Sequence, residues 1–225
     1  MKTNKPMLKE TVGSLYTAFN TPTKEGEFDP KAYEETSKSD VVKNIGTTEN
    51  SEATTVRASG SDYEVVNQTS SIDMAVEVVA FDPSELARMR GDDTSDEGGL
   101  ILSGAPARRP FFAFGKVVKK VGGGVQYAWY PKCQLVENTD DIATSEDTFS
   151  ETATETLQVG CKDTKVPGGI LIIGVRAFAF NEDNQKKVYV DSETANFPKG
   201  LKEEQFFAKP ILTKEDLVAA ITPGT

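Results

Sequence analysis

The chain has 225 residues, no histidine, and a formal net charge of −10 from 25 Lys and Arg against 35 Asp and Glu. The lack of histidine excludes His-dependent catalytic triads, His metal ligands and an imidazole pH switch. The acidic balance makes the chain a poor candidate for binding nucleic-acid phosphates or an anionic membrane. The length predicts one domain over residues 1–225.

The N-terminal part of the chain carries few structural signals. Residues 1–40 predict an arm that includes a strand at residues 11–19. Residues 46–62 are small, polar and turn-rich, and we interpret them as a long loop. The first ten residues lack the apolar segment of a signal peptide, and no run approaches the roughly 20 apolar residues of a membrane helix. We therefore expect a soluble intracellular protein with reduced thiols.

A strand with one buried face is predicted at residues 71–80. Ile72 and Met74 alternate there with Asp73 and, further along, Glu77, which is the period of a half-buried strand. The two acids therefore share the solvent face. A shift of register by one residue would exchange the two faces.

A short helix is predicted over residues 82–90. Asp82 suits the N-cap and Glu85 the N3 position of a capping box. Two turns are too short to be stable alone, so the apolar side chains of the helix are expected to pack on the strands. The residues expected to cap and pack this helix are Phe81, Asp82, Pro83, Glu85, Leu86 and Met89.

A β-hairpin is predicted by two strand-like runs, residues 109–120 and 125–136, on either side of a triple glycine. Pro131 within the second run predicts either an edge position or a bulge. Residues 138–154 are polar and rich in Ser and Thr, and predict a second long loop.

The last third of the chain predicts further strands and a helix. Residues 170–180 form an apolar run that is predicted to pair with residues 186–191 as a hairpin. Residues 195–225 form a C-terminal extension with a short helix, because Thr213 and Asp216 match a capping box. The whole pattern predicts a mainly β fold: a β-sandwich or barrel with one short central helix, long polar loops and a short C-terminal helix.

No catalytic constellation stands out in the sequence. Trp129 and Tyr127 have the spacing of a sugar-stacking platform, but their aliphatic neighbours favour core packing. Cys133 and Cys161 suit buried thiols or one disulfide, and two cysteines cannot supply the four ligands of a structural zinc site. Pairs of acids could serve a glycosidase only at a suitable separation in space, which the sequence does not define. We therefore expect a protein without enzymatic activity, cofactor or metal.

Six segments follow one another between about residues 40 and 165. They are the polar loop 46–62, the alternating strand 71–80, the helix DPSELARMRG, the strands RRPFFAFG and VQYAWYPKCQL, and the polar run ENTDDIATSEDTFSETATETLQV. This order resembles the major tail protein, or tail tube protein, of long-tailed bacteriophages and related tail-like particles of Gram-positive bacteria. The resemblance implies a structural virion protein whose hexameric rings stack into the tail tube, the conduit for DNA delivery. It implies assembly in the host cytoplasm and a place in the virion tail.

The resemblance also implies partners. These are further copies of the chain, the tape-measure protein, tail-tip or baseplate proteins and the tail-terminator protein, with DNA passing transiently through the lumen and no membrane binding. Asp73 and Glu77 are candidate lumen-facing acids, since an acidic lumen repels DNA phosphates. The candidate contacts between subunits and rings are Thr47, Glu49, Glu52, Arg57, Asp62, Asp140, Asp141, Glu146 and Asp147.

The alternative interpretation is a β-sandwich module of a virion, of the carbohydrate-binding or adhesin type. Such a module needs exposed aromatic side chains, so it predicts that Trp129 is accessible to solvent. In the tail tube interpretation, Trp129 is largely buried. A two-carboxylate enzyme without histidine is a third interpretation, and it needs a cleft with a raised carboxyl pKa.

Overall fold

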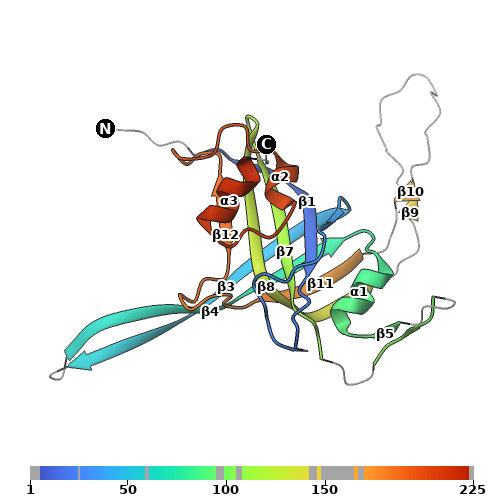
Figure 1. The fold of residues 1–225 in the computed structure, drawn as a ribbon, viewed down its shortest axis with the longest axis horizontal. Coiled ribbons are helices and arrows are strands. Elements are labelled where there is room, and N and C mark those ends of the chain that lie inside the picture. Colours follow the sequence, from blue (N-terminus) through green and yellow to red (C-terminus); the bar gives the residue numbers. More distant parts are fainter. Residues whose placement is uncertain are drawn as a thin grey trace, which may run out of the picture.

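The computed structural model describes residues 6–24, 26–58, 61–94, 99–104, 108–141, 146–147, 165–166 and 170–222. The fold is mainly β, as the sequence predicts, and most strands join one antiparallel sheet (Figure 1). The strands follow the order β2-β1-β7-β8-β11-β4-β3, and β12 pairs with β8 outside this path. The strands of this sheet are β1 (Lys9–Phe19), β2 (Ser37–Ser39), β3 (Val42–Ala58), β4 (Ser61–Val78), β7 (Phe112–Lys120), β8 (Gly124–Asp141), β11 (Ile170–Ala177) and β12 (Val188–Asp191). The remaining elements are α1 (Pro83–Arg90), β5 (Asp93–Thr94), β6 (Ile101–Leu102), β9 (Glu146–Asp147), β10 (Lys165–Val166), α2 (Glu203–Phe207) and α3 (Lys214–Ile221).

The sheet curls around an inner core. Buried side chains of β1, β4 and β11, such as Leu15, Val76 and Ile173, belong to this one cluster, and α1 adds Leu86 and Met89 as predicted. The two end strands of the sheet, β2 and β3, are not hydrogen-bonded to each other in the part of the chain that the structure describes. The sandwich or barrel expected from the sequence is therefore a curled antiparallel sheet that does not close into a barrel.

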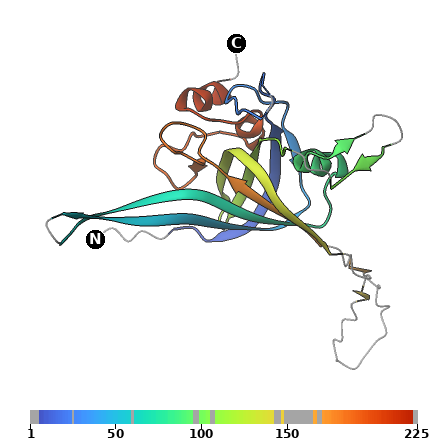
Figure 2. The ribbon, with the colours of Figure 1, turned by 90° about the horizontal axis from the view of Figure 1, so that it is seen from below.

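An outer core covers the other face of β1, β7 and β8, where the C-terminal helices lie (Figure 2). Trp129 is 0% exposed, and its indole Nε1 donates a hydrogen bond to the Phe206 carbonyl at 3.1 Å. The Tyr16 and Phe207 rings stack with centroids 4.0 Å apart. Gly115 permits this contact, because a Cβ there would lie 2.7 Å from a Phe207 ring carbon. The C-terminal extension thus forms a layer of the fold.

The strand predicted at residues 71–80 is confirmed as the inner half of β4. Ile72 and Met74 are buried in the inner core on alternate positions. The strand ends at Val78, and Phe81 packs against the same core just before α1.

The start of α1 is confirmed, with one correction. The Asp82 carboxylate accepts hydrogen bonds from the backbone N–H groups of Ser84 and Glu85, at 2.7 and 3.2 Å, and Pro83 opens the helix. The Glu85 carboxylate does not close the predicted capping box: it accepts a hydrogen bond from the Thr17 hydroxyl at 3.3 Å. The neighbouring strand β1 supplies this donor, so Glu85 joins α1 to the sheet.

The long loop predicted at residues 46–62 is wrong. Residues 46–58 belong to β3 and residues 61–62 to β4, and the two strands pair from Val42 and Val78 out to Ala58 and Ser61. The physical reason is that a two-stranded ribbon needs no buried face. Its sequence therefore need not show the apolar alternation by which half-buried strands are predicted.

The hairpin predicted between residues 170–180 and 186–191 is also wrong. β11 lies between β4 and β8, whereas β12 pairs with residues 126–129 of β8. The long strand β8 provides separate lengths of edge for β11 and β12, so the two need not pair with each other. Pro131 lies between these two lengths, beside a register shift in the β7–β8 ladder. The bulge expected there is confirmed, in a central strand.

Two further predictions are confirmed, and a third is partly tested. β7 and β8 form the hairpin expected around the glycine turn. Thr213 and Asp216 close the capping box at the start of α3. Residues 138–141 of the second predicted loop belong to β8 and residues 146–147 form β9, while residues 142–145 and 148–154 lie outside the described residues. Cys133 is a buried free thiol, and Cys161 lies outside the described residues.

Candidate functional site

The first candidate site is the β3–β4 hairpin, which projects from the rest of the sheet (Figures 1 and 2). β11 pairs with β4 only over residues 72–78, so beyond them β3 and β4 pair only with each other. We call residues 51–58 and 61–70 the hairpin arm. At about 3.3 Å per residue, the arm extends roughly 30 Å past the last three-stranded part of the sheet. Among the described strands, neither edge of the arm has a ladder partner.

The unpaired edges allow the arm to form backbone hydrogen bonds with another strand. An isolated two-stranded ribbon is only marginally stable in water, and its unpaired backbone N–H and C=O groups can accept a further strand. Three of the predicted contact residues, Glu52, Arg57 and Asp62, lie on this arm. The structure therefore places them on one projecting strand pair.

The root of the arm is held by a polar cluster. The Asn50 side-chain amide donates to the Ser71 hydroxyl at 3.1 Å and to the Asp73 carboxylate at 2.8 Å. Arg176 on β11 donates to both Asp73 oxygens, at 2.6 and 3.0 Å. The hydrogen bonds from Arg176 hold the pKa of Asp73 below its ordinary value. Asp73 is therefore paired, and the face that the sequence predicts to be acidic is partly neutralised.

The outer face of β3, β4 and β11 is polar and lies away from α2 and α3, which are on the far side of the sheet in Figure 2. A row of small residues crosses it: Gly46, Ala75 and Gly174 are ladder neighbours. Glu77 lies on the next row and is half-buried. This face is the one on which a lumen lining was predicted from Asp73 and Glu77, and that role stays a prediction.

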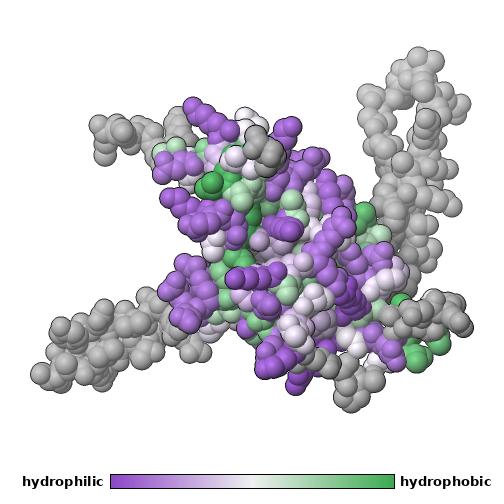
Figure 3. Space-filling view, viewed as in Figure 1, coloured by the Kyte–Doolittle hydropathy of each residue, from purple (hydrophilic) through white to green (hydrophobic). Residues whose placement is uncertain are grey.

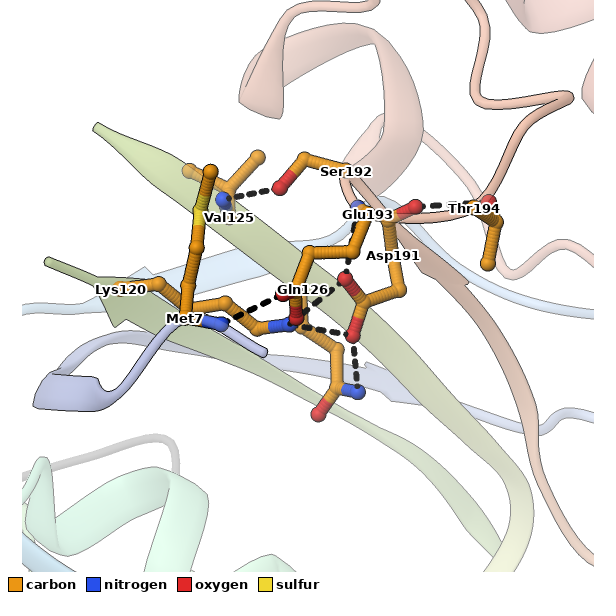
Figure 4. A network of polar contacts seen from close by, with 8 residues as sticks. All are labelled: Met7, Lys120, Val125, Gln126, Asp191, Ser192, Glu193 and Thr194. Atoms are coloured by element: carbon orange, nitrogen blue, oxygen red, sulfur yellow. Dashed lines mark hydrogen bonds and ion pairs between the residues drawn. The ribbon is translucent and has the colours of Figure 1, made fainter. Parts of the chain in front are cut away.

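A buried ion cluster anchors the start of the chain (Figure 4). The Lys120 ammonium donates to both Asp191 oxygens, at 2.7 and 2.8 Å, and also to Glu193. The backbone N–H of Met7 donates to the other Glu193 oxygen at 2.5 Å. Burial acts to lower the pKa of Lys120, but the hydrogen bonds to both carboxylates raise it. The cluster fixes the N-terminal segment and the end of β12 to the β7–β8 hairpin.

A second projection exposes aliphatic side chains. Leu100, Ile101 and Leu102 are 57%, 37% and 58% exposed. They lie at β6, which pairs with β5 after α1, and Figure 3 shows a hydrophobic group at this end of the molecule. The only local sequence signal for this surface is the apolar run GLIL at residues 99–102, which follows an acidic stretch.

The other predicted contact residues do not lie together on the arm. Thr47 and Glu49 lie on β3 within the body, where Lys116 donates to the Thr47 hydroxyl and Lys187 pairs with Glu49, both at 2.8 Å. Asp140 and Asp141 lie at the far end of β8, opposite the start of β11. Glu146 and Asp147 form β9, which pairs with β10.

The aromatic platform considered from the sequence is absent from the surface. Trp129 is fully buried and Tyr127 is 5% exposed, so both belong to the outer core. This burial contradicts the exposed Trp129 that the carbohydrate-binding alternative predicts. Within the described ranges, no three His, Cys, Asp or Glu side chains are grouped as a metal site, and no helix is long and apolar enough to span a membrane.

Neither a scan of protein-family models nor a search of curated proteins gives a match to this chain.

Proposed function

We propose that the chain is a structural subunit that assembles with copies of itself, as the tail tube proteins that its sequence resembles do. The hairpin arm is the observation that carries this proposal. It places a ribbon with two unpaired edges roughly 30 Å beyond the sheet that supports it. A strand of a neighbouring copy would complete the backbone hydrogen bonds of such an edge.

Rings and tubes, which the resemblance implies, need a different kind of contact from that of a simple two-fold dimer. The arm of one copy would meet a different surface of the next copy, which makes the interface heterologous. Heterologous contacts close into rings when the rotation allows it, and extend into filaments when it does not. The exposed aliphatic residues Leu100, Ile101 and Leu102 are a second contact candidate, because exposed apolar patches mark interaction surfaces.

The tail tube role adds a lumen and further partners to this proposal. The polar outer face of β3, β4 and β11 would line the lumen, with the Asp73–Arg176 pair and Glu77 on it. The net charge of −10 would keep DNA phosphates from adhering to the tube. The tape-measure, tail-tip and tail-terminator proteins would then be partners, and the virion tail the location.

The test is negative-stain electron microscopy of the purified chain across protein and salt concentrations. We expect rings or hollow tubes. A variant in which an Asn-Gly turn replaces residues 51–70 keeps the Asn50–Ser71 pair beside a favoured two-residue turn. This variant should fold as a monomer that keeps a cooperative unfolding transition, and it should fail to form rings.

The control replaces Glu182 and Asp183, two exposed residues outside the arm, by serine, and should assemble normally. Tubes formed by the armless variant would show that the arm is not the contact. A wild-type chain that stays monomeric, even with tail-tip complexes added, would contradict the proposed function.

A further inference from the structure

A polar cavity of about 750 Å³ opens inside the curl of the sheet. Its lining comes from β1, β3, β7, β8 and β12. α1 lies at the opposite end of β1, where the Arg88 guanidinium covers the Phe19 ring, whereas the cavity is lined by residues 9–12. The curled sheet therefore has one end filled by α1 and apolar side chains, and one end hollow.

Basic side chains outnumber acidic ones in this cavity. The charged lining residues are Lys9, Lys43, Lys116 and Lys187 against Glu10 and Glu49. We call it the lysine cavity. Its excess of positive charge contrasts with the net charge of −10 of the whole chain. A concave site lined by one sign of charge concentrates counter-ions of the opposite sign.

Lys116 is the central group of the cavity. Lys116 lies on β7, and its side chain is half-buried. Its ammonium donates a hydrogen bond to the Thr47 hydroxyl at 2.8 Å and lies 5.3 Å from the centre of the Tyr130 ring. No carboxylate forms an ion pair with it in the described part of the chain. Burial, together with repulsion from Lys187 and Lys9, lowers the pKa of Lys116 to about 8. The charge of Glu49 offsets only part of this effect, so a bound anion would further stabilise the charged form of Lys116.

Lys187, the residue just before β12, completes the arrangement. Its ammonium pairs with Glu49 at 2.8 Å and lies 5.3 Å from the centre of the Tyr189 ring. Glu49 thus pairs with Lys187, and the cavity has room for more oxygen acceptors beside Lys116.

We propose that the lysine cavity binds an oxyanion, a phosphate or carboxylate group, between the ammonium groups of Lys116 and Lys187. Lys9 and Lys43 lie exposed at the same cavity and attract the anion toward it. The oxyanion belongs either to a free phosphate compound or to an acidic side chain of another copy of the chain. The same ammonium groups serve both sources, because each offers oxygen acceptors to charged donors.

The probe is inorganic phosphate, added to the full-length chain at constant ionic strength and followed by NMR of the lysine ammonium groups. We expect a saturable shift of the Lys116 and Lys187 signals that sodium chloride does not reproduce. The pKa of Lys116 should rise from about 8 when phosphate is bound, since the anion stabilises its charged form.

Two variants and a control make the test specific. Lys116→Met keeps most of the side-chain volume and should weaken phosphate binding at least about tenfold, the loss expected for a hydrogen bond between charged groups. Lys116→Arg should retain binding. Lys209→Met, at an exposed site away from this cavity, should leave it unchanged.

A second titration separates the two sources of the oxyanion. If the anion is a carboxylate of another copy, the Lys116 signal should shift as protein concentration rises without phosphate, and phosphate should reverse the association. If it is a free phosphate compound, protein concentration should have no effect. The proposal is overturned if neither titration moves the Lys116 and Lys187 signals more than exposed lysines, or if Lys116→Met binds phosphate as the wild type does. The phosphate titration at low protein concentration reports on the monomer, so its failure is distinguishable from a failure of tube formation.

Discussion

Strand β7 and the hairpin arm are both antiparallel β structure, yet they are stabilised in different ways. β7 has sheet neighbours on both edges and a core on both faces: Phe112 and Phe114 enter the inner core, and Val117 enters the outer core. The arm has one neighbour for each strand and no second layer among the described residues. Burial therefore stabilises the body, whereas the arm has surface and backbone groups available for another molecule.

The largest loss of stability is expected from substitution of Trp129, a fully buried side chain of the outer core. Trp129→Ala should lower the free energy of unfolding by about 3–5 kcal/mol, because it empties a large volume in the outer core. Trp129→Phe should cost less, since it keeps most of the packed ring. Urea unfolding followed by circular dichroism measures both, and equal losses would show that the indole hydrogen bond to Phe206 dominates.

The ion cluster at the end of β7 should give the next largest effect. Lys120→Met should lower the free energy of unfolding by about 3 kcal/mol, because it leaves the largely buried Asp191 carboxylate without its cation. Lys119→Met is the matched control: its side chain is exposed on the same strand, and the change should stay within about 0.5 kcal/mol. Similar values for the two variants, from urea unfolding at neutral pH, would contradict the structural role of Lys120.

Stability at acidic pH should depend on two paired carboxylates. These are Asp191 in the Lys120 cluster and Asp73 beside Arg176. Hydrogen bonds from Arg176 lower the pKa of Asp73. Burial acts to raise the pKa of Asp191, but the hydrogen bonds and charge of Lys120, with hydrogen bonds from the Glu193 backbone and Gln126, together lower it. A depressed carboxyl pKa stabilises the fold above the ordinary Asp value of 3.8 and loses that contribution as pH falls through the folded value. Stability should therefore fall below about pH 4, and Lys120→Met should flatten that fall. An unchanged acid limb in the variant would exclude Asp191 as a source.

The smallest effect on stability is expected in the arm. Replacing residues 51–70 by Asn-Gly should change the free energy of unfolding of the monomer by less than about 1 kcal/mol, because an isolated ribbon adds little to a core. The same change should abolish assembly. Hydrogen exchange on the wild type should be fast along the arm and slow along β7. A large loss of stability in the armless variant would remove the contrast between the two regions.

Several parts of the candidate site could not be predicted from the sequence. Asp73 and Glu77 were placed on one face of a strand correctly, since alternation is a local property. The partner of Asp73 is Arg176, 103 positions away, and no local pattern indicates that pair. The lysines of the cavity come from β1, β3, β7 and the residue before β12, and only the curl of the sheet brings them together. The capping role predicted for Glu85 is wrong for the same reason. Its carboxylate accepts a hydrogen bond from Thr17 on β1, which is distant in the sequence.

The sequence by itself determined the elements whose signals lie within one segment. It determined the alternating half of β4, the capped start of α1, the β7–β8 hairpin, and the capping box of α3. Only the tertiary structure decided that β11 lies between β4 and β8, that α2 buries Trp129, and that residues 51–58 and 61–70 form a projecting ribbon. The physical reason is that caps, turns and alternation depend on near neighbours along the chain, whereas strand order and the covering of a face depend on which distant segments bury surface together.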